Sequence, residues 1–401
     1  MTTATRIRRG VGGLIRVAVS WVRITVGLAT LALVTTAQAR TLHVAAETAS
    51  SQPLTIYGVL DPPQVRPLLA DFHQRNPDIE IEYHNLETLA LHARVLQERN
   101  APRADVLMSP AMPWQYELAN EGLSEPLDSP AAAAWPSWAR WRQELFGFTF
   151  EPIVMVYRRD LAQRMAPPTS HAELLNLLQQ HADVLKHRVA TYDPRRSGAG
   201  YTYAIEDARI SARYWDLVEA LGQSHSALET TTGAMLEGLS DGRYWIGYNL
   251  IGSYVQDYVA THPELVMVVP QDYALVLQRL VMMSREAPHP AAARRFIDYL
   301  LSAPAQRLLA SHTTLGAVHP GIDGAGTAAD LRARLGDAIR PVQIGPGLLA
   351  TLDTLKRQTL LEQWQQAFDN HSTFTDGPME PSAPFSPTPV PTASLPEASQ
   401  P

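Results

Sequence analysis

The sequence predicts an α/β protein built on largely parallel sheets. Three consecutive segments carry this prediction: residues 54–59 are strand-like, residues 63–76 form an amphipathic helix, and residues 79–84 alternate apolar and polar side chains as a strand. Strands that alternate with helices of this length are typical of a parallel sheet covered by helices. With 401 residues, the chain is long enough for two domains.

The first 39 residues have the pattern of a secretory signal peptide. Arginines dominate the start of the chain, residues 24–36 are mostly apolar, and Ala37-Gln38-Ala39 has small residues around a cleavage point. The apolar run is shorter than a comfortable membrane span, so cleavage is favoured over a retained anchor. We therefore expect residues 1–39 to be a signal peptide and the mature protein to be exported to the periplasm.

Composition excludes several classes of function. The chain has no cysteine, which excludes disulfides, thiolate chemistry and a lipid anchor on a cysteine after Ala39. A hydrophobic content of 45% and a charged content of 18% are ordinary for a globular protein. The net charge of −7, with no basic stripe beyond the first 25 residues, argues against a nucleic-acid partner.

The first lobe is predicted to span residues 54–150, after a flexible N-terminus at residues 40–53. Residues 86–98 predict a second helix, and residues 105–108 predict a short buried strand followed by a further helix. In such sheets, ligands bind beyond the carboxyl ends of the strands. This rule selects residues 58–61, 109–112 and 193–200.

The second lobe is predicted at residues 151–269, and residues 270–370 are expected to return to the first lobe and end in helices. From element order alone, residues 151–156 and 268–273 are interpreted as two crossings between the lobes. The last helix is expected at residues 347–367. Residues 371–401 are rich in Pro, Ser and Thr, which predicts a disordered tail.

The segment 190–207 is the strongest candidate site. It reads as a strand, a turn at Asp193-Pro194, and a helix that begins near Ser197. The free N–H groups and the positive dipole end of a helix N-terminus favour an anion, glycines let the backbone approach it, and a hydroxyl adds a donor. The alternative is an ordinary strand–turn–helix connection with glycine at the turn.

Tyrosines are further candidates, because a ring and a hydroxyl together suit an organic anion or a sugar-like ligand. Each of them also fits a half-buried position in the core. Tyr201 and Tyr248 are preferred, since both lie in predicted cleft loops. The full set is Tyr192, Tyr201, Tyr203, Tyr248, Tyr254 and Tyr273.

No catalytic constellation is recognisable in the chain. The thirteen histidines show no zinc-type spacing, and G-x-S-x-G, H-E-x-x-H and P-loop motifs do not occur. We therefore expect neither an enzyme nor a cofactor, and no metal site.

Six segments in this order along the chain carry a family resemblance: ADVLMSPAM (104–112), GFTFEPIVMVYRRDL (147–161), ATYDPRRSGAGY (190–201), WIGYNLIGSYV (245–255), VPQDYALVLQR (269–279) and HPAAARRFIDYLLS (289–302). Together they resemble the extracellular solute-binding proteins of bacterial ABC transporters. The branch is the type II fold shared by ferric-iron, hexose-phosphate and phosphoglycerate-responsive binding proteins. The resemblance covers residues 54–368 and implies two α/β lobes, joined by two or three crossing segments, that close on a ligand.

The resemblance also implies the ligand-binding residues. Ser197-Gly198-Ala199 match the turn that grips an anion, and Tyr248-Asn249 match a polar contact from the second lobe. Asp272-Tyr273 match the last crossing. The expected ligand-binding residues are Ser109, Ala111, Met112, Ser197, Gly198, Ala199, Gly200, Tyr201, Tyr248, Asn249, Asp272 and Tyr273.

Iron-binding members of this branch use adjacent tyrosines after the region of Tyr248. Here residues 249–252 read Asn-Leu-Ile-Gly, with no tyrosine pair. This departure argues against iron, because no other feature of the segment would stabilise a tyrosinate ligand.

The expected function is capture of a small anionic solute, a phosphorylated metabolite or an organic acid, for an ABC permease in the inner membrane. The protein is expected to be a monomer that works by hinge closure. Two alternatives stay open: a periplasmic sensor that presents its bound state to a membrane histidine kinase, and ferric-iron binding with a synergistic anion.

Overall fold

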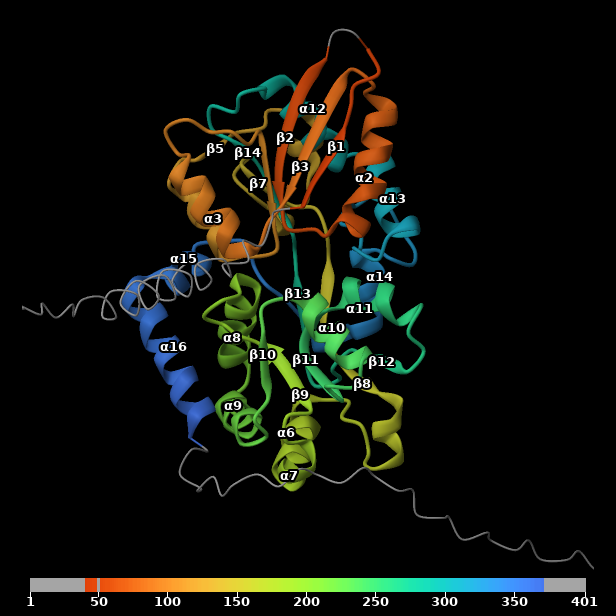
Figure 1. Ribbon diagram of the computed structural model, residues 1–401. Helices are drawn as coiled ribbons and strands as arrows, with labels where there is room; N and C mark the ends of the chain where they lie inside the picture. Colours follow the sequence, from red (N-terminus) through yellow and green to blue (C-terminus); the bar gives the residue numbers. More distant parts are fainter. Residues whose placement is uncertain (1–39, 49–50, 371–401) are drawn as a thin grey trace, which may run out of the picture.

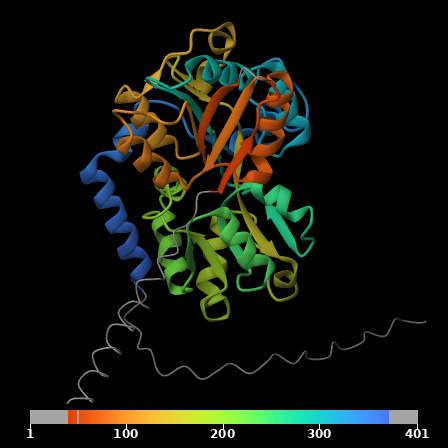
Figure 2. The ribbon, with the colours of Figure 1, turned by 45° about the horizontal axis from the view of Figure 1, so that its top comes forward.

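The computed structural model describes residues 40–48 and 51–370, and it contains two α/β lobes that lie one above the other in Figure 1. Lobe 1, at the top, holds the N-terminal strands, and lobe 2 holds the middle of the chain. Figure 2 brings the sheet of lobe 1 forward and shows the same division. The predicted α/β fold with two lobes is confirmed. The predicted signal peptide and the predicted tail lie outside the described residues.

Lobe 1 is built on a mixed sheet. Its strands are β1 (Arg40–Val44), β2 (Gln52–Gly58), β3 (Ile79–Asn85), β4 (Val106–Ser109), β5 (Ser124–Glu125), β6 (Arg140–Trp141), β7 (Leu145–Gly147) and β14 (Leu280–Ser284). The strand order is β1-β3-β2-β4-β14-β7-β6, and β5 also pairs with β14. β2 is parallel to β3 and β4, whereas β14 returns antiparallel to β4.

Helices cover both faces of this sheet. One face carries α2 (Pro62–Arg75), α5 (Pro130–Ala134), η1 (Ser137–Ala139), α12 (Pro290–Leu300), α13 (Ala303–His312) and α14 (Ala328–Leu335). The other face carries α3 (Thr88–Gln97), α4 (Met112–Asn120) and α15 (Gly347–Leu352). In α2, which corresponds to the amphipathic helix predicted at residues 63–76, the apolar stripe of Val65, Leu68, Leu69 and Phe72 is buried against the sheet.

Lobe 2 repeats this arrangement. Its strands are β8 (Glu151–Arg158), β9 (Val189–Tyr192), β10 (Ala227–Glu229), β11 (Ile246–Ile251), β12 (Leu265–Val268), β13 (Ala274–Leu277) and β15 (Ile339–Pro341). The strand order is β10-β9-β11-β8-β13-β15, and β12 also pairs with β8. β9 is parallel to β10 and β11, whereas β8 is antiparallel to β11 and β13.

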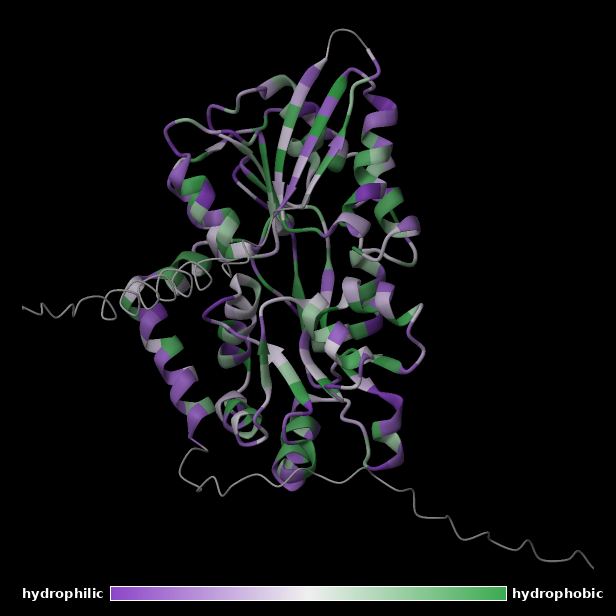
Figure 3. Ribbon diagram, in the orientation of Figure 1, coloured by the Kyte–Doolittle hydropathy of each residue, from purple (hydrophilic) through white to green (hydrophobic). Residues whose placement is uncertain are grey.

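The helices of lobe 2 also form two layers. They are α6 (His171–Gln180), α7 (Ala182–Leu185), α8 (Gly198–Ile210), α9 (Tyr214–Gln223), α10 (Thr232–Ser240), α11 (Gly252–Val259) and α16 (Thr354–Asp369), with short turns η2 (Arg159–Gln163) and η3 (Gly336–Ala338) elsewhere. α10 and α11 cover one face of the sheet, and α6, α9 and α16 cover the other. Figure 3 shows hydrophobic residues along the strands and mostly hydrophilic residues on α16. None of the helices in the described part of the chain is both long and apolar enough to cross a bilayer.

The N-terminal segment is more ordered than predicted. Residues 40–53 were expected to be flexible, but residues 40–44 form β1, which pairs antiparallel with β3. Leu42 and Val44 pack against the core of lobe 1. This strand covers the outer edge of β3, which would otherwise present unpaired backbone groups to solvent.

The chain crosses from lobe 1 to lobe 2 at residues 148–150 and back at residues 278–279, and it crosses again toward its end, since β15 pairs with β13 in lobe 2 and α15 packs on α4 of lobe 1. Both predicted crossings were wrong: residues 151–156 belong to β8, and at residues 268–273 the chain is still inside lobe 2, since β13 pairs with β8. Lobe 2 therefore extends to Leu277 rather than to residue 269. The physical reason is that β8 accepts β12 and β13 as successive neighbours, so the chain completes a further strand before it leaves the lobe.

A buried ion pair joins the two crossing segments. Arg279 Nε lies 2.9 Å from Glu151 Oε1, and Nη2 lies 3.2 Å from Oε2. Thr149 donates its hydroxyl to Glu151 and accepts the backbone N–H of Arg279, and Ser253 also donates to Glu151. Both charged side chains are at most 1% exposed. The pair therefore holds the crossing segments together at a place almost closed to bulk solvent.

The two C-terminal helices, α15 and α16 (residues 347–369), lie across both lobes and are here called the strap. The helix predicted at residues 347–367 is divided at Asp353, whose backbone is extended and whose carboxylate caps α16 by accepting the N–H of Lys356. α15 packs on α4 of lobe 1, and α16 packs on α9 of lobe 2 rather than returning to lobe 1 as expected. Trp364 donates its indole N–H to the Tyr214 hydroxyl at 3.1 Å in this contact.

Gly222 is predicted to be required for the docking of α16. A Cβ atom at this position would lie 1.8 Å from the carbonyl oxygen of Phe368, so Gly222→Ala must displace the strap. Urea unfolding should show a loss of about 1–3 kcal/mol, as for other overpacked sites. Gly347→Ala in α15 is the control, since nothing lies within 4 Å of its Cβ. Equal stability of both variants would contradict a tight contact between α9 and α16.

Candidate functional site

A cavity of about 50 Å³ lies between the lobes. From lobe 1 it is lined by Val59, Asp61, Asn85, Leu86, Glu87, Thr88 and Pro110. From lobe 2 it is lined by Tyr192, Ser197, Ala199, Thr230, Thr231, Thr232, Gly233, Ile251 and Tyr254, with Arg279 at the crossing. Larger hollows on lobe 1 take residues from that lobe alone. On a scale where one water needs 10–15 Å³, this cavity holds about four.

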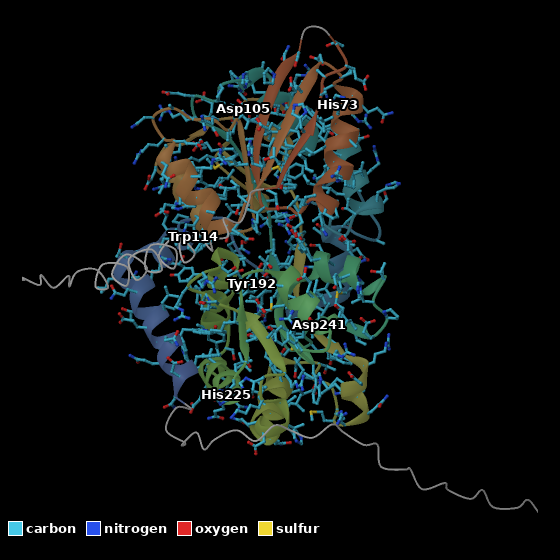
Figure 4. All side chains as sticks on the ribbon, viewed as in Figure 1. His73, Asp105, Trp114, Tyr192, His225 and Asp241 are labelled. Carbon is cyan, nitrogen blue, oxygen red and sulfur yellow. The ribbon has the colours of Figure 1, made fainter. Side chains whose placement is uncertain are left out.

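The cavity follows from the topology of the sheets. Its residues come directly after β2, β3, β4, β9, β10 and β11, where helices begin. This is the carboxyl end of parallel strands, the location that the sequence predicted. Figure 4 places Tyr192, the last residue of β9, near the middle of the molecule, at the end of lobe 2 that faces lobe 1.

The start of α8 contributes hydrogen-bond donors. Ser197 caps the helix by accepting the N–H of Gly200, and Gly198 donates its N–H to the Thr88 hydroxyl of lobe 1 at 3.0 Å. Ala199 lines the cavity, and its N–H lies in the first turn, where no acceptor exists within the helix.

The start of α10 adds a second set of donors. Thr231 caps this helix by accepting the N–H of Ala234, and the Thr232 hydroxyl is hydrogen-bonded to the Tyr192 hydroxyl at 2.6 Å. The N–H groups of Thr232 and Gly233 lie in the first turn and have no acceptor within the helix. Together, the two helix starts place partial positive charge on one wall of the cavity.

The starts of α8 and α10 form, together with Arg279, the side of the cavity that presents hydrogen-bond donors, here called the donor wall. The guanidinium of Arg279 lines the cavity, and the Tyr254 ring lies 5.3 Å from it. Burial opposes its charge, but the Glu151 carboxylate more than offsets this and raises the pKa of Arg279, so the group stays charged. Its hydrogen bonds to Glu151 use Nε and Nη2, which leaves Nη1 without a partner among the described residues.

The wall from lobe 1 is acidic. Asp61 and Glu87 stand at the N-caps of α2 and α3, and neither carboxylate caps its own helix. Desolvation, together with the negative charge of Asp61, raises the pKa of Glu87. The side chain of Glu87 is nevertheless exposed to solvent.

The lobes touch on both sides of the cavity. Besides the bond between Gly198 and Thr88, the backbone N–H of Asp61 donates to the Tyr254 hydroxyl at 3.2 Å. A Cβ atom on Gly198 would lie only 3.1 Å from the Cβ of Ala111, so glycine permits this close approach. The structure is therefore a conformation in which the lobes meet around the cavity.

Few of the predicted ligand-binding residues line the cavity. Ser197 and Ala199 do, and Gly198 makes the contact between the lobes beside it. Gly200 packs beneath the ring of Tyr192, where a Cβ would lie 2.5 Å from the Cβ of that tyrosine.

Four other predicted residues serve packing instead. Tyr201 lies edge-on to Trp114 at 5.2 Å and donates its hydroxyl to the Thr351 carbonyl of the strap. Ala111 belongs to the same apolar cluster. Ser109 accepts the N–H of Ala111, and Met112 is buried in the core of lobe 1. Figure 4 shows Trp114 on the strap side of the molecule.

The remaining predicted residues lie inside lobe 2. Tyr248, Asn249 and Tyr273 all donate to the fully buried carboxylate of Asp207, over distances of 2.7–2.9 Å. A bulge in β11, where Asn249 has φ 64°, turns Tyr248 and Asn249 to the same side. Asp272 accepts from His171, whose ring stacks on Tyr273. None of these four residues lines the cavity between the lobes.

Two parts of the cavity were missed from the sequence. Residues 230–233 read Thr-Thr-Thr-Gly, which is an N-cap signal before the apolar residues of α10 and was a usable clue. Arg279 follows Gln278 between two apolar runs, residues 274–277 and 280–283, where a charge indicates a buried partner. Its partner, Glu151, is 128 residues away in the sequence, so spacing gave no indication of the pair.

The Asp207 network is predicted to be essential for the stability of lobe 2. Burial raises the pKa of Asp207, against the opposing effects of His171 and of three hydrogen bonds. Asp207→Ala leaves three buried donors without an acceptor and should cost about 3 kcal/mol or more in urea unfolding. Asp207→Asn keeps the volume and one acceptor oxygen, and should lose clearly less. Equal losses would show that packing, not hydrogen bonding, dominates there.

Asp272 is predicted to contribute to stability in acid. Burial raises its pKa, but the hydrogen bond and charge of His171 and two backbone N–H groups lower it from 3.8 to about 2. A lowered carboxyl pKa stabilises the fold above pH 4 and loses this effect as the pH falls toward 2. With a third of the side chain exposed, about 1–2 kcal/mol is expected. His171→Ala should flatten the decline between pH 4 and 2, whereas Arg334→Ala, at an exposed pair, should not.

Comparisons with known proteins show the family of this chain. The family model for bacterial extracellular solute-binding proteins matches residues 62–312. A substrate-binding protein of an ABC transporter from Agrobacterium tumefaciens is 34% identical, with a TM-score of 0.80 over 82% of this chain and 98% of that chain. None of the curated protein sequences compared with the chain matches it.

Two further solved structures share the fold at lower identity. The periplasmic binding protein AfuA from Actinobacillus pleuropneumoniae, with fructose-6-phosphate bound, is 16% identical (TM-score 0.65, 79% of this chain and 99% of that chain). The apo ferric ion-binding protein A of Pasteurella haemolytica is 18% identical (TM-score 0.62, 80% and 99%). Within residues 40–48 and 51–370, no group of three or more His, Asp or Glu side chains is placed to hold a metal ion.

With this fold, cavity and family match, the chain belongs to the bacterial extracellular solute-binding proteins, the periplasmic components of ABC transporters that bind a small ligand for a membrane permease and are typically not enzymes.

Proposed function

We propose that this protein captures a small solute with an acidic group, a phosphorylated metabolite or an organic acid, for an ABC importer. The observation that carries the proposal is the donor wall of lobe 2, where the N-termini of α8 and α10 meet Arg279 at one cavity. Each helix N-terminus acts as roughly half a positive charge. Backbone N–H groups without an intrahelical acceptor then bind the oxygens of the acidic group.

Capture works by closure of the lobes. The contacts between Gly198 and Thr88 and between Tyr254 and Asp61 form only when the lobes meet. A ligand that touches both walls binds the closed form more tightly and shifts the population toward it. The crossing segments held by Glu151 and Arg279 are the expected hinge.

Delivery to a permease is favoured over presentation to a sensor kinase, because the 34% identical structure is a transporter substrate-binding protein. The acidic group of the ligand is consistent with the fructose-6-phosphate that AfuA binds. Iron is not proposed, since residues 249–252 lack the adjacent tyrosines of iron-binding members and no group of three or more His, Asp or Glu side chains among the described residues is placed for a metal ion.

The proposal predicts that Ser197→Ala weakens ligand binding. Calorimetric titration of the purified protein would use inorganic phosphate, ethyl phosphate, propionate and Fe(III). Loss of one hydroxyl donor should reduce the affinity for the acidic probes about tenfold. Ser170→Ala is the matched control, because Ser170 also caps a helix by accepting the N–H three residues on but lies outside the cavity.

Both variants lose a helix cap, so both should lose about 1 kcal/mol of stability. A difference in their affinities for the acidic probes then reports on binding and not on the lost cap. Equal affinities in the two variants would contradict the proposed role of α8. Binding of Fe(III) alone, without any acidic probe, would overturn the proposal.

A further inference from the structure

Two side-chain hydroxyls meet in the donor wall. Tyr192, at the end of β9, and Thr232, in the first turn of α10, are hydrogen-bonded through their hydroxyls at 2.6 Å and are here called the hydroxyl pair. Both residues line the cavity, and they are only 5% and 3% exposed. The oxygen of Thr232 also accepts the backbone N–H of Ile251 at 3.3 Å. The hydroxyl pair is therefore a buried part of the wall whose position is fixed by the backbone of β11.

One proton of the hydroxyl pair has no acceptor. Each hydroxyl carries one proton, and the bond between them uses one of the two, whichever group donates. Burial raises the pKa of Tyr192, so its hydroxyl keeps its proton. The remaining proton finds no acceptor among the described residues, because the further contact of Thr232 is with a donor, the N–H of Ile251. A buried donor without an acceptor is costly, so an acceptor from the ligand is expected here.

The donor wall offers more donors than a carboxylate can use. The N–H groups of Ala199, Thr232 and Gly233 have no acceptor within their helices. Nη1 of Arg279 and the hydroxyl proton of Ser197, whose oxygen accepts a backbone N–H, have no acceptor among the described residues. Together with the hydroxyl pair, these groups outnumber the roughly four acceptor positions on the two oxygens of a carboxylate.

An acidic group with three terminal oxygens fits this set of donors. A phosphoryl or phosphonyl group supplies the third oxygen, and its oxygens are strong acceptors. The cavity of about 50 Å³ holds about four water molecules, which is close to the space of the four atoms around one phosphorus. Little space is left for the rest of the ligand, so the ligand is small.

We propose that the hydroxyl pair of Tyr192 and Thr232 donates to the third oxygen of a phosphoryl or phosphonyl group, and that the site thereby selects such a group over a carboxylate. The proposal rests on the acid capture proposed above and narrows its substrate class to phosphate, small phosphate esters and small phosphonates. A hydrogen bond to a charged oxygen is about twice as strong as one between neutral groups, so the pair contributes directly to affinity.

Calorimetric titration at about pH 8, where a phosphate ester is a dianion, tests the selection. Inorganic phosphate and ethyl phosphate are compared with propionate and malonate. Malonate is also a dianion and has as many non-hydrogen atoms as ethyl phosphate, so it controls for charge and size. The tighter of the two phosphates should bind at least about tenfold more tightly than either carboxylate, the usual scale of one charged hydrogen bond. Which of the two binds more tightly distinguishes the free ion from an ester.

Substitutions that keep the shape of the side chains test the hydroxyl pair. Tyr192→Phe keeps the bond between Thr232 and Ile251, and should weaken phosphate binding several-fold, because it removes either the donor or the group that orients it. The double variant with Thr232→Val removes both hydroxyls and should weaken phosphate binding about tenfold. Propionate binding should stay within about twofold, since the N–H groups and Arg279 suffice for two oxygens, and this shows that the site is still folded.

Tyr203→Phe is the matched control. Tyr203 is a buried tyrosine whose ring lies 5.8 Å from that of Tyr192, but its hydroxyl has no partner among the described residues and it does not line the cavity. This variant should leave every affinity unchanged.

Three results would contradict the proposal. Propionate or malonate binding as tightly as the phosphates would overturn the selection and leave acid capture standing. Unchanged phosphate affinity in both Tyr192→Phe and the double variant would overturn the role of the hydroxyl pair. No binding of any acidic probe would overturn this proposal and acid capture together.

Discussion

The ion pair between Glu151 and Arg279 is the interaction on which the arrangement of the lobes depends. It joins the two crossing segments, and Thr149 and Ser253 satisfy the remaining oxygens of Glu151. Burying two charges is unfavourable unless they are paired with good geometry, and removing one partner of such a pair typically costs 3–5 kcal/mol. The same pair places the guanidinium of Arg279 at the cavity, so one interaction serves both the hinge and the site.

The topology of the sheets explains why a binding site forms between the lobes. In each lobe, parallel strands end at the boundary with the other lobe. The helices that follow these strands begin there, so their first turns face the opposite lobe. Lobe 2 supplies Ser197 and Thr231 as caps with open N–H groups behind them, whereas lobe 1 places carboxylates at the corresponding caps of α2 and α3. Similar backbone geometry thus gives two walls of different charge, because the cap residues differ.

The strap adds a further connection between the lobes. α15 is packed on lobe 1 and α16 on lobe 2, and the apolar cluster around Trp114 and Tyr201 lies where the two helices and both lobes meet. An edge-on aromatic pair of this kind contributes about 0.5–1.5 kcal/mol beyond its buried area. Since this cluster contains residues of both lobes and of the strap, the strap limits the directions in which the lobes can separate.

The sequence by itself determined the α/β class, the two-lobed family resemblance, most helices and strands, and the helix start at Ser197, because periodicity and caps are local signals. Only the tertiary structure decided which side chains reach the cavity. The bulge at Asn249 turns Tyr248 toward Asp207, and Arg279 meets a partner 128 residues away. Strand register, bulges and long-range pairing set the direction of a side chain, and none of them leaves a periodic trace in the sequence.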